Sequence, residues 1–504
     1  QRQMCIRDSY QIFPERFKNG DPSRTPADAD AWGAPPTREN FMGGDLAGIT
    51  EGLDYIQSLG VTCLYLTPIF RSPSNHKYDT ADYFEIDPAF GTKDDLRRLV
   101  DGVHARGMRI ILDGVFNHCG YWWDKFQDVV RNGEASPYHS WFFIHSYPVD
   151  AGRQNYDCVG HYKWMPKLNL ADPDARDYFL SIGRYWLQEF HIDGWRLDVA
   201  ADLGHSPEFN HKFWKEFRRV VKEANPEAII LAEHYGDAMS WLQGDEWDTV
   251  MNYDAFMEPV SWFLTGMEKH SDEFNQGLLG NSESFIGAMT YHMPAFYAPS
   301  LYTAMNELDN HDHSRFLTRT NHRVGRVANV GPYAAAENTN KAVLREAVVI
   351  QMTWPGAPTL YYGDEAGQVG FTDPDNRRTY PWGQEDQELI RFYKEMIAVH
   401  RRFPVLAMGS LKFLYHDYNV LSYGRFNQEE QVIVVINNRN ERVHVEIPVW
   451  LTGINRSSVA KLTQVFATDA VGFSSEEKEI EAPAGILEMD LLPLSGVVLH
   501  RCEE

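Results

Sequence analysis

The stretch Arg109-Ile-Ile-Leu-Asp-Gly-Val-Phe-Asn-His118 is a short apolar run that ends in polar residues. The same arrangement recurs in Gly194-Trp-Arg-Leu-Asp198, in Ile229-Ile-Leu-Ala-Glu-His234 and in Ala304-Met-Asn-Glu-Leu-Asp-Asn-His-Asp312. Each apolar run has the length of a buried strand. Because the C-terminal ends of parallel barrel strands meet at one rim, the polar residues are expected to share one pocket.

These four runs belong to a longer series of short apolar segments that alternate with helical patterns. Leu96, Leu99 and Val103 show the helical spacing in one of the intervening segments. Eight strands alternating with helices predict an α/β fold, a (β/α)8 barrel that covers residues 10–402. The expected strands are Tyr10–Phe13, Cys63–Leu66, Arg109–Leu112, Gly194–Leu197, Ile229–Ala232, Thr249–Asn252, Ala304–Leu308 and Thr359–Tyr362.

One connection, residues 117–170, is longer than the loops of a barrel usually are. It separates the third strand from a helix expected near Pro173, and structureless loops of this length are uncommon in a compact domain. We therefore expect these residues to pack as an excursion domain after strand 3. The aromatic residues available for its core are Trp122, Trp123, Trp141, Phe142, Phe143 and Trp164.

The pattern changes after Arg402, where helical spacing gives way to short alternating or apolar runs separated by turns. Residues 403–504 are therefore expected to form a C-terminal antiparallel β-sandwich. Its expected strands are Leu411–Tyr415, Val420–Arg425, Gln431–Asn437, Val443–Ile447 and Gly496–Leu499.

Composition excludes several classes of partner. The chain has 504 residues and a net charge of −24, which disfavours nucleic acid and anionic lipid. No apolar stretch approaches the roughly 20 residues that span a bilayer. We therefore expect neither a nucleic-acid nor a membrane partner.

The cysteines and the N-terminus bear on location. Five scattered cysteines form no disulfide or metal-binding pattern, which favours a reducing compartment and a cytoplasmic protein. Residues 1–9 have no apolar signal-peptide core, and Asp8 and Ser9 are poor residues for opening a buried strand. We interpret residues 1–9 as a non-native leader or as the trace of a missing upstream segment.

Asp198 and Glu233 are the strongest candidates for catalysis. They follow consecutive strands, and neighbouring strands lie about 4.8 Å apart. Retaining glycoside hydrolysis needs two carboxyl groups about 5–5.5 Å apart, one as nucleophile and one as general acid. Arg196 points the same way as Asp198 and would keep it ionised. Glu233 must be protonated to act as the acid, so a raised pKa is predicted for it.

The four motifs resemble, in order, the four signature regions of the α-amylase family of glycoside hydrolases. The resemblance implies that Asp198 is the nucleophile, Glu233 the general acid/base and Asp312 the stabiliser of the transition state. It also implies that Asp113 is a supporting carboxylate. The side chains expected to line the subsite of the attacked sugar are Tyr78, His118, Arg196 and His311.

A narrower resemblance points to the neopullulanase, cyclomaltodextrinase and maltogenic amylase group. It rests on Met165-Pro-Lys-Leu-Asn169, on Tyr10-Gln-Ile-Phe-Pro-Glu-Arg-Phe17 and on Phe41-Met-Gly-Gly-Asp45. The group acts on maltooligosaccharides, cyclodextrins and pullulan, which are therefore the expected substrates. By the same resemblance, Asp373 and Arg377 would hold the next sugar.

The chain departs from this group in three ways. It contains no residues for the group's N-terminal β-sandwich, so the expected dimerisation and cyclodextrin preference are in doubt and the oligomeric state stays open. Glu233 is followed by His234-Tyr235, which can alter the acceptor side or simply pack. Asn310 and His313 flank the His311-Asp312 pair and are expected to tune binding.

No cofactor is expected to be required for catalysis, but the resemblance raises the question of a structural calcium ion near the start of the barrel. The residues that resemble such a site are Asn19, Asp21, Gly43 and Asp45, and oxygen ligands suit that ion. Arg24 and Thr25 stand where further ligands would be expected. The alternative for Asn19-Gly-Asp21 is an Asx turn, and the sequence leaves both open.

The expected function is that of a retaining hydrolase that cleaves α-1,4 and, as an open question, α-1,6 glucosidic bonds. An α-glucan transglycosylase of the same fold would use the same carboxylates, and water access alone would distinguish it. A non-catalytic carbohydrate-binding relative is a third alternative. It is disfavoured because Asp198, Glu233 and Asp312 are all present.

Overall fold

The computed structural model describes residues 8–204 and 206–502. The chain forms two compact units. The first contains the residues up to Gln57 together with Thr62–Met251, and the second contains Ser58–Val61 and the residues from Asn252 onward. Each unit contains parallel strands.

The first unit contains six parallel strands in the order β8-β7-β6-β5-β2-β1. They are β1 (Ser9–Ile12), β2 (Cys63–Leu66), β5 (Arg109–Gly114), β6 (Gly194–Leu197), β7 (Ile229–Ala232) and β8 (Thr249–Val250). The helices between them are α1 (Pro14–Phe17), α2 (Leu46–Glu51), α3 (Leu53–Leu59), α4 (Lys93–Ala105), α6 (Pro173–Phe190) and α7 (Pro207–Ala224). A short antiparallel pair, β3 (Phe70–Arg71) and β4 (Asp82–Ile86), precedes α4.

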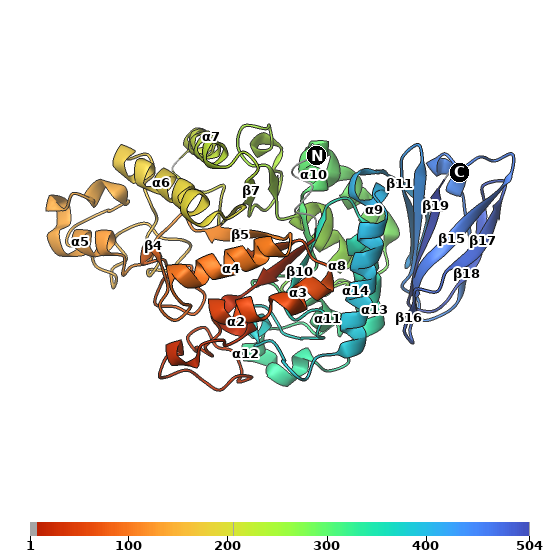
Figure 1. Cartoon of the computed structure of the whole chain (residues 1–504), viewed down its shortest axis with the longest axis horizontal. Coiled ribbons are helices and arrows are strands. Elements are labelled where there is room, and N and C mark those ends of the chain that lie inside the picture. The colour runs from red at the N-terminus through yellow and green to blue at the C-terminus, as the bar shows by residue number, and fades with distance from the viewer. Residues whose placement is uncertain (1–7, 205, 503–504) are drawn as a thin grey trace. The chain divides into compact units, whose positions relative to one another are not determined.

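Local sequence explains where these helices begin. Thr92 and Asp95 form a reciprocal capping box at the start of α4. Asp172 caps α6, whose first turn also contains Pro173. The apolar faces of both helices are buried, and Figure 1 shows α4 and α6 alongside β5.

The excursion between β5 and α6 contains α5 (Asp124–Asn132) and two short 3-10 helices. Figure 1 shows α5 beyond α4 and α6, at the far end of this unit. Isolated antiparallel bridges join the ends of the excursion, one of them between His118 and Lys167. Its interior is aromatic, as expected, and contains Trp123, Phe126, Trp141, Phe142 and Tyr156. Two tryptophans expected in that interior, Trp122 and Trp164, are instead exposed.

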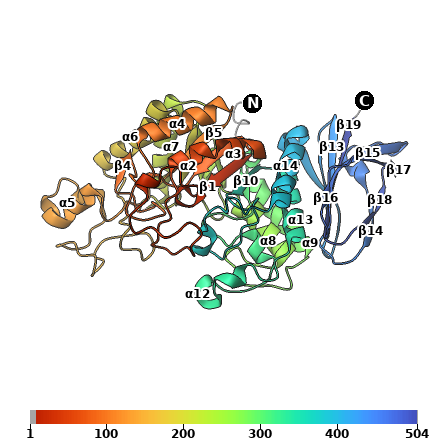
Figure 2. The ribbon, with the colours of Figure 1, turned by 60° about the horizontal axis from the view of Figure 1, so that its bottom comes forward.

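The second unit contains the parallel pair β9 (Met305–Glu307) and β10 (Ala357–Tyr361). Its helices are α8 (Glu258–Thr265), α9 (Ser282–His292), α10 (Ala298–Tyr302), α11 (Phe316–Arg319), α12 (Val327–Val330), α13 (Lys341–Thr353), α14 (Gln387–Arg402) and α15 (Val405–Met408). Figure 2 shows α13 between β10 and the C-terminal strands.

The C-terminal strands form antiparallel sheets around an aliphatic core. One sheet has the order β11-β12-β13-β19-β15-β16 with β17 also paired to β15, and the other is the pair β14-β18. The strands are β11 (Ser410–Asp417), β12 (Val420–Phe426), β13 (Glu430–Asn437), β14 (Val443–Ile447), β15 (Val459–Thr468), β16 (Phe473–Ser474), β17 (Lys478–Pro483), β18 (Leu487–Leu491) and β19 (Ser495–Cys502).

The expected fold class is confirmed, because eight strands belong to one parallel sheet and antiparallel sheets follow them. Three of the eight barrel strands agree to the residue, and the boundaries of the other five differ by at most two residues. β1 begins at Ser9, which is buried and pairs with Cys63, so the view of Ser9 as a poor strand residue is wrong. Residues 1–7 of the expected leader lie outside the described residues. In the described part of the chain, no helix is long and apolar enough to span a bilayer.

Candidate active site

Three carboxylates stand at neighbouring strand ends in the first unit. Asp113 lies at the end of β5, and Asp198 and Glu233 directly follow β6 and β7. The strand ladder continues one residue past β6 and β7, because Asp198 N–H donates to Gly114 O (3.0 Å) and Glu233 N–H donates to Leu197 O (2.9 Å). Asp198 and Glu233 are therefore held side by side at about the spacing of adjacent strands.

Arg196 is the fully buried cation at the centre of this group. Its Nη1 donates to both oxygens of Asp113 at 3.0 Å and to Asp198 Oδ1 at 2.9 Å. Its Nη2 lies 3.2 Å from Glu233 Oε2. The predicted contact between Arg196 and Asp198 is present, but the same guanidinium also serves the other two carboxylates.

One guanidinium cannot neutralise three carboxylates, and this governs their protonation. Burial and the neighbouring Glu233 carboxylate raise the pKa of Asp198 well above its ordinary range, while Arg196 acts in the opposite direction. Asp198, next to Glu233, therefore holds a proton more readily than an isolated aspartate does. A pair that holds one proton supplies the two states that retaining hydrolysis needs, one carboxylate and one carboxylic acid.

Asp113 is a supporting residue in this geometry. Besides Arg196, its Oδ2 accepts hydrogen bonds from the hydroxyls of Tyr65 (2.7 Å) and Tyr78 (2.9 Å). Burial raises the pKa of Asp113, and Arg196 and the two hydroxyls oppose that effect. Asp113 thus fixes the position of Arg196 and also holds Tyr78, the residue expected to contact the sugar.

His118 has its ring nitrogens directed at protein atoms. Its Nε2 lies 3.0 Å from the carbonyl oxygen of Tyr78, and its Nδ1 lies 3.3 Å from Asn117 Oδ1. Burial lowers the pKa of His118 to about 4, so the imidazole is neutral at ordinary pH. His118 therefore connects the loop that contains Tyr78 to the segment that follows β5.

Val199 was not foreseen from the sequence. It follows Asp198 and has φ of +44°, a left-handed conformation that is unfavourable for a β-branched residue. This conformation directs its backbone N–H at Glu233 Oε2, 2.9 Å away. The strained residue therefore fixes the side chain of Glu233 next to Asp198.

In the second unit, Asp312 lies after β9 with its neighbours His311 and Arg377. Arg377 Nη2 donates to Asp312 Oδ1 (3.2 Å), and Arg377 Nε donates to the carbonyl of His311 (2.9 Å). His311 Nε2 is 3.5 Å from the same Asp312 oxygen. The Asp312 side chain remains one-third exposed and accessible to a ligand. The structure thus joins the expected residues His311, Asp312 and Arg377 in one cluster.

The loop that contains Asp373 and Arg377 is fixed to the backbone around Asp312. Asn376 Nδ2 donates to the carbonyls of Asn310 (2.9 Å) and His313 (2.7 Å), and Thr372 donates to the carbonyl of Asp312. Asp373 itself is only partly buried at the start of this loop. Asn310 and His313 therefore act here through the backbone, as anchors of the loop.

The residues proposed for calcium do not fit that ion. Both oxygens of Asp45 accept backbone N–H groups, from Gly20, Asp21 and Gly48. The Asp21 carboxylate accepts from Ser23 and from Arg24 Nε (3.0 Å). Arg24 thus supplies positive charge where a divalent ion would be needed.

The other two candidate ligands do not change this result. Asn19 donates to Thr25, although its Oδ1 is buried without a hydrogen-bond donor. Gly43 donates its N–H to Glu15. Within residues 8–204 and 206–502, no group of three or more His, Cys, Asp or Glu residues is arranged to hold a metal. The Asx turn weighed for Asn19-Gly-Asp21 is also absent, because Asp21 N–H donates to Asp45, and the turn of this kind in the segment is at Asp21, whose Oδ1 accepts from Ser23 N–H (3.2 Å).

The chain is similar to known proteins over most of its length. Residues 11–406 match the family model described as the alpha amylase catalytic domain. The chain is 41% identical to neopullulanase 2 of Thermoactinomyces vulgaris. The match covers 97% of the present chain and 77% of that relative. The chain is also 41% identical to a cyclomaltodextrinase of Geobacillus thermopakistaniensis, over 88% of its own length and 72% of that protein.

A solved structure covers the chain almost completely. It is the cyclic α-maltosyl-(1→6)-maltose hydrolase of Arthrobacter globiformis in complex with cyclic α-maltosyl-(1→6)-maltose, with a TM-score of 0.81, 31% identity and 99% of each chain covered. The chain belongs to the α-amylase family of glycoside hydrolases. Within that family it is an α-glucan hydrolase related to the neopullulanases and cyclomaltodextrinases.

Proposed function

We propose that this enzyme hydrolyses α-1,4-glucosidic bonds with retention of configuration, with Asp198 as nucleophile and Glu233 as general acid/base. The observation that supports this assignment is the pair of adjacent carboxyls bridged by Arg196, at 2.9 Å to Asp198 and 3.2 Å to Glu233. Two carboxyl groups at neighbouring strand ends lie near the separation found in retaining enzymes, which is about 5–5.5 Å. Inverting enzymes need about 6.5–9.5 Å between the two groups.

In the first step, an oxygen of Asp198 attacks the anomeric carbon while Glu233 gives its proton to the glycosidic oxygen. The C–O bond to the leaving sugar breaks, and a covalent glycosyl ester of Asp198 forms. Arg196 donates to Asp198 throughout and limits the energetic cost of an ionised carboxylate in a buried site.

In the second step, the Glu233 carboxylate removes a proton from water as the water oxygen attacks the anomeric carbon. The ester bond breaks, Asp198 leaves as a carboxylate, and Glu233 regains its proton. The N–H of Val199 holds Glu233 in one position for both transfers. None of these steps uses a metal or cofactor.

Motif resemblance adds further residues to this proposal. Asp312 stabilises the positive charge that develops on the sugar ring, and Arg377 holds its carboxylate. Tyr78 and His311 contact the attacked sugar, and Asp373 binds the sugar beyond it. The hydrogen bond from Tyr78 to Asp113 supports this role, because it fixes the ring beside Arg196.

For the substrate, we propose maltooligosaccharides, cyclodextrins and pullulan, with α-1,6 cleavage as a second activity. The names of the relatives support this range, as does the Met165–Asn169 motif. The unpaired described cysteines Cys63, Cys119 and Cys158 support a reducing, cytoplasmic location.

The test is the Asp198→Asn variant assayed on maltotriose and β-cyclodextrin. Loss of the nucleophile should abolish turnover while thermal denaturation stays cooperative. A folded variant with wild-type turnover would refute the assignment. An NMR time course on the wild type should show the α-anomer first, and the β-anomer first would exclude the double displacement.

Transfer to a second sugar uses the same glycosyl ester of Asp198. Product analysis at rising maltotriose concentration distinguishes the two outcomes. Hydrolysis gives glucose and maltose at all concentrations, whereas a transglycosylase accumulates products longer than maltotriose.

A further inference from the structure

Two tryptophans of the excursion, Trp122 and Trp164, are exposed, although Trp123 beside the first of them is buried. The exposed fraction is 57% for Trp122 and 46% for Trp164, compared with 1% for Trp123. Tyr162, close to Trp164 in sequence, is also 57% exposed. Exposed apolar patches of this kind mark binding surfaces more often than isolated apolar residues do.

The two indole rings form an ordered pair. Their planes are nearly parallel, at 13°, with ring centroids 6.4 Å apart. Tyr121 supports both rings edge to face, at 5.1 Å from Trp122 and 5.2 Å from Trp164. The Lys163 ammonium lies over the Trp164 ring at 4.8 Å. Their orientation is thus set by neighbours, while 57% of Trp122 and 46% of Trp164 remain exposed.

The backbone beneath these rings is fixed by hydrogen bonds. Tyr121 N–H donates to Trp164 O (2.8 Å), and Cys119 N–H donates to Pro166 O (3.0 Å). Gln127 Nε2 donates to the carbonyl of Tyr121 (2.8 Å). The tryptophans therefore stand on a rigid support, which reduces the entropic cost of binding a ligand.

This support starts beside the Tyr78 loop, near the end of β5 that contains Asp113. His118 and Lys167 are bridged, and from there the two segments run toward Trp122 and Trp164. Trp122 is four residues from His118, so their Cα atoms lie within about 14 Å. Gly120 lies close against the Tyr78 loop, because a Cβ there would be 2.2 Å from Asp79 O.

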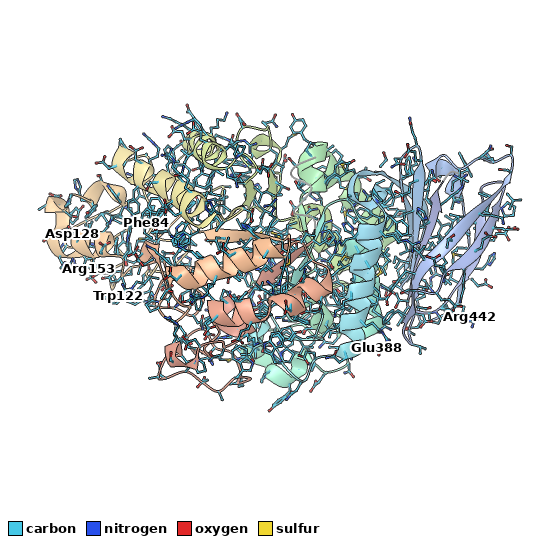
Figure 3. All side chains as sticks on the ribbon, viewed as in Figure 1. Phe84, Trp122, Asp128, Arg153, Glu388 and Arg442 are labelled. Carbon is cyan, nitrogen blue, oxygen red and sulfur yellow. The ribbon has the colours of Figure 1, made fainter. Side chains whose placement is uncertain are left out.

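We propose that Trp122 and Trp164 form a sugar-binding platform outside the catalytic pocket, which holds the distal part of a long α-glucan chain. Figure 3 labels Trp122 on the excursion, together with Asp128 and Arg153. A pyranose ring has an apolar C–H face that matches an aromatic face in size and polarity. The ligand is uncharged, which suits a chain whose net charge of −24 disfavours anions.

This inference rests on the proposed function, because it requires an α-glucan in the pocket. It predicts that the platform matters for long substrates and has little effect on short ones. The proposal requires that a maltoheptaose bound across Asp198 and Glu233 reach the tryptophans, and that a maltotriose, with fewer than half as many sugar units, not reach them. The other occupant that an exposed aromatic patch suggests is a second copy of this chain.

The test is the Trp122→Ala/Trp164→Ala double variant, with kcat/KM measured for maltotriose and maltoheptaose. The ratio of kcat/KM for maltoheptaose to that for maltotriose should fall about tenfold, mainly through KM. Tyr291→Ala, which removes an 80% exposed tyrosine from α9, should keep the wild-type ratio. An unchanged ratio in the double variant refutes the platform while the proposed function stands. A wild type inactive on both sugars refutes the proposed function itself.

A binding measurement and a size measurement complete the test. In the Asp198→Asn background, maltoheptaose should quench tryptophan fluorescence, and most of the quenching should disappear when Trp122 and Trp164 are replaced. Sedimentation velocity should give the same species for the wild type and the double variant. A dimer that dissociates on replacement would overturn the proposal in favour of self-association.

Discussion

Asp113→Asn tests the supporting role of Asp113 beside Arg196. The substitution keeps the size of the side chain but replaces one carboxylate oxygen by an NH₂ group. In the native protein both oxygens face donors, since Arg196 Nη1 contacts each and the Tyr65 and Tyr78 hydroxyls contact Oδ2. Whichever way the amide turns, at least one donor faces another donor.

The magnitude follows from the type of hydrogen bond that the substitution removes. A hydrogen bond to a charged group contributes about 1.5–3 kcal/mol, and about 1.4 kcal/mol corresponds to a factor of ten in rate. If the transition state loses that much stabilisation because Arg196 is no longer held in place, kcat should fall by about 10- to 150-fold. The Asp113 charge also raises the pKa of Asp198, so its removal should lower that pKa. The acid limb of the pH profile of kcat/KM should therefore move to lower pH.

The assay is the pH dependence of kcat and kcat/KM on maltotriose, with thermal denaturation to check folding. Tyr65→Phe is the matched control, because it removes one donor to Asp113 and leaves the negative charge in place. It should lower kcat by about tenfold or less, without moving the acid limb downward. A folded Asp113→Asn enzyme whose acid limb stays in place or moves to higher pH would refute the proposed effect of the Asp113 charge on the pKa of Asp198.

Two further predictions concern stability. Glu346 is fully buried on α13, has no hydrogen-bond partner for either oxygen, and has a pKa that burial raises well above 4.5. Below pH 4.5 both the folded and unfolded states hold the proton. Above it the unfolded state releases the proton first, which lowers stability by about 1.4 kcal/mol per pH unit up to the folded-state pKa. Glu346→Gln should therefore raise the free energy of unfolding at pH 7.5, and a gain of equal size at pH 4.5 would contradict this cause. Because Arg24 and backbone N–H groups satisfy Asp21 and Asp45, EDTA should leave the melting temperature unchanged. A loss of several degrees that calcium restores would show that the site binds the ion.

The sequence predicts the barrel strands well because burial on both sides leaves a simple signal. Cys63–Leu66, Gly194–Leu197 and Ile229–Ala232 are correct to the residue. The strand β15 (Val459–Thr468) was missed, because exposed Lys461 and other polar residues interrupt its apolar positions. β17 (Lys478–Pro483) is largely charged on its exposed face and gives no apolar run at all.

Candidate residues at strand ends follow directly from the motifs, whereas their partners do not. Tyr65 lies in β2, whose sequence indicates only a buried apolar strand. Tyr65 is one residue before the end of that strand, and its hydroxyl is the only feature that could have indicated a polar contact. Val199 looks apolar, but its function lies in a backbone conformation that no side-chain pattern encodes. The exposure of Trp122 and Trp164 depends on the folded excursion, so the sequence alone assigned both to its core.

The sharing of Arg196 has a consequence for which molecules the pocket favours. Three carboxylates face one guanidinium, so the cluster with one bound proton still carries a net charge of −1. A neutral glucoside does not change this net charge, whereas the positive charge of the oxocarbenium-like transition state compensates it. Because the charge is fixed before any ligand arrives, a sugar analogue with a permanent positive charge at the ring should be preferred over its neutral counterpart. That preference should fade in acid, where a second proton occupies the cluster and cancels the charge that attracted the analogue.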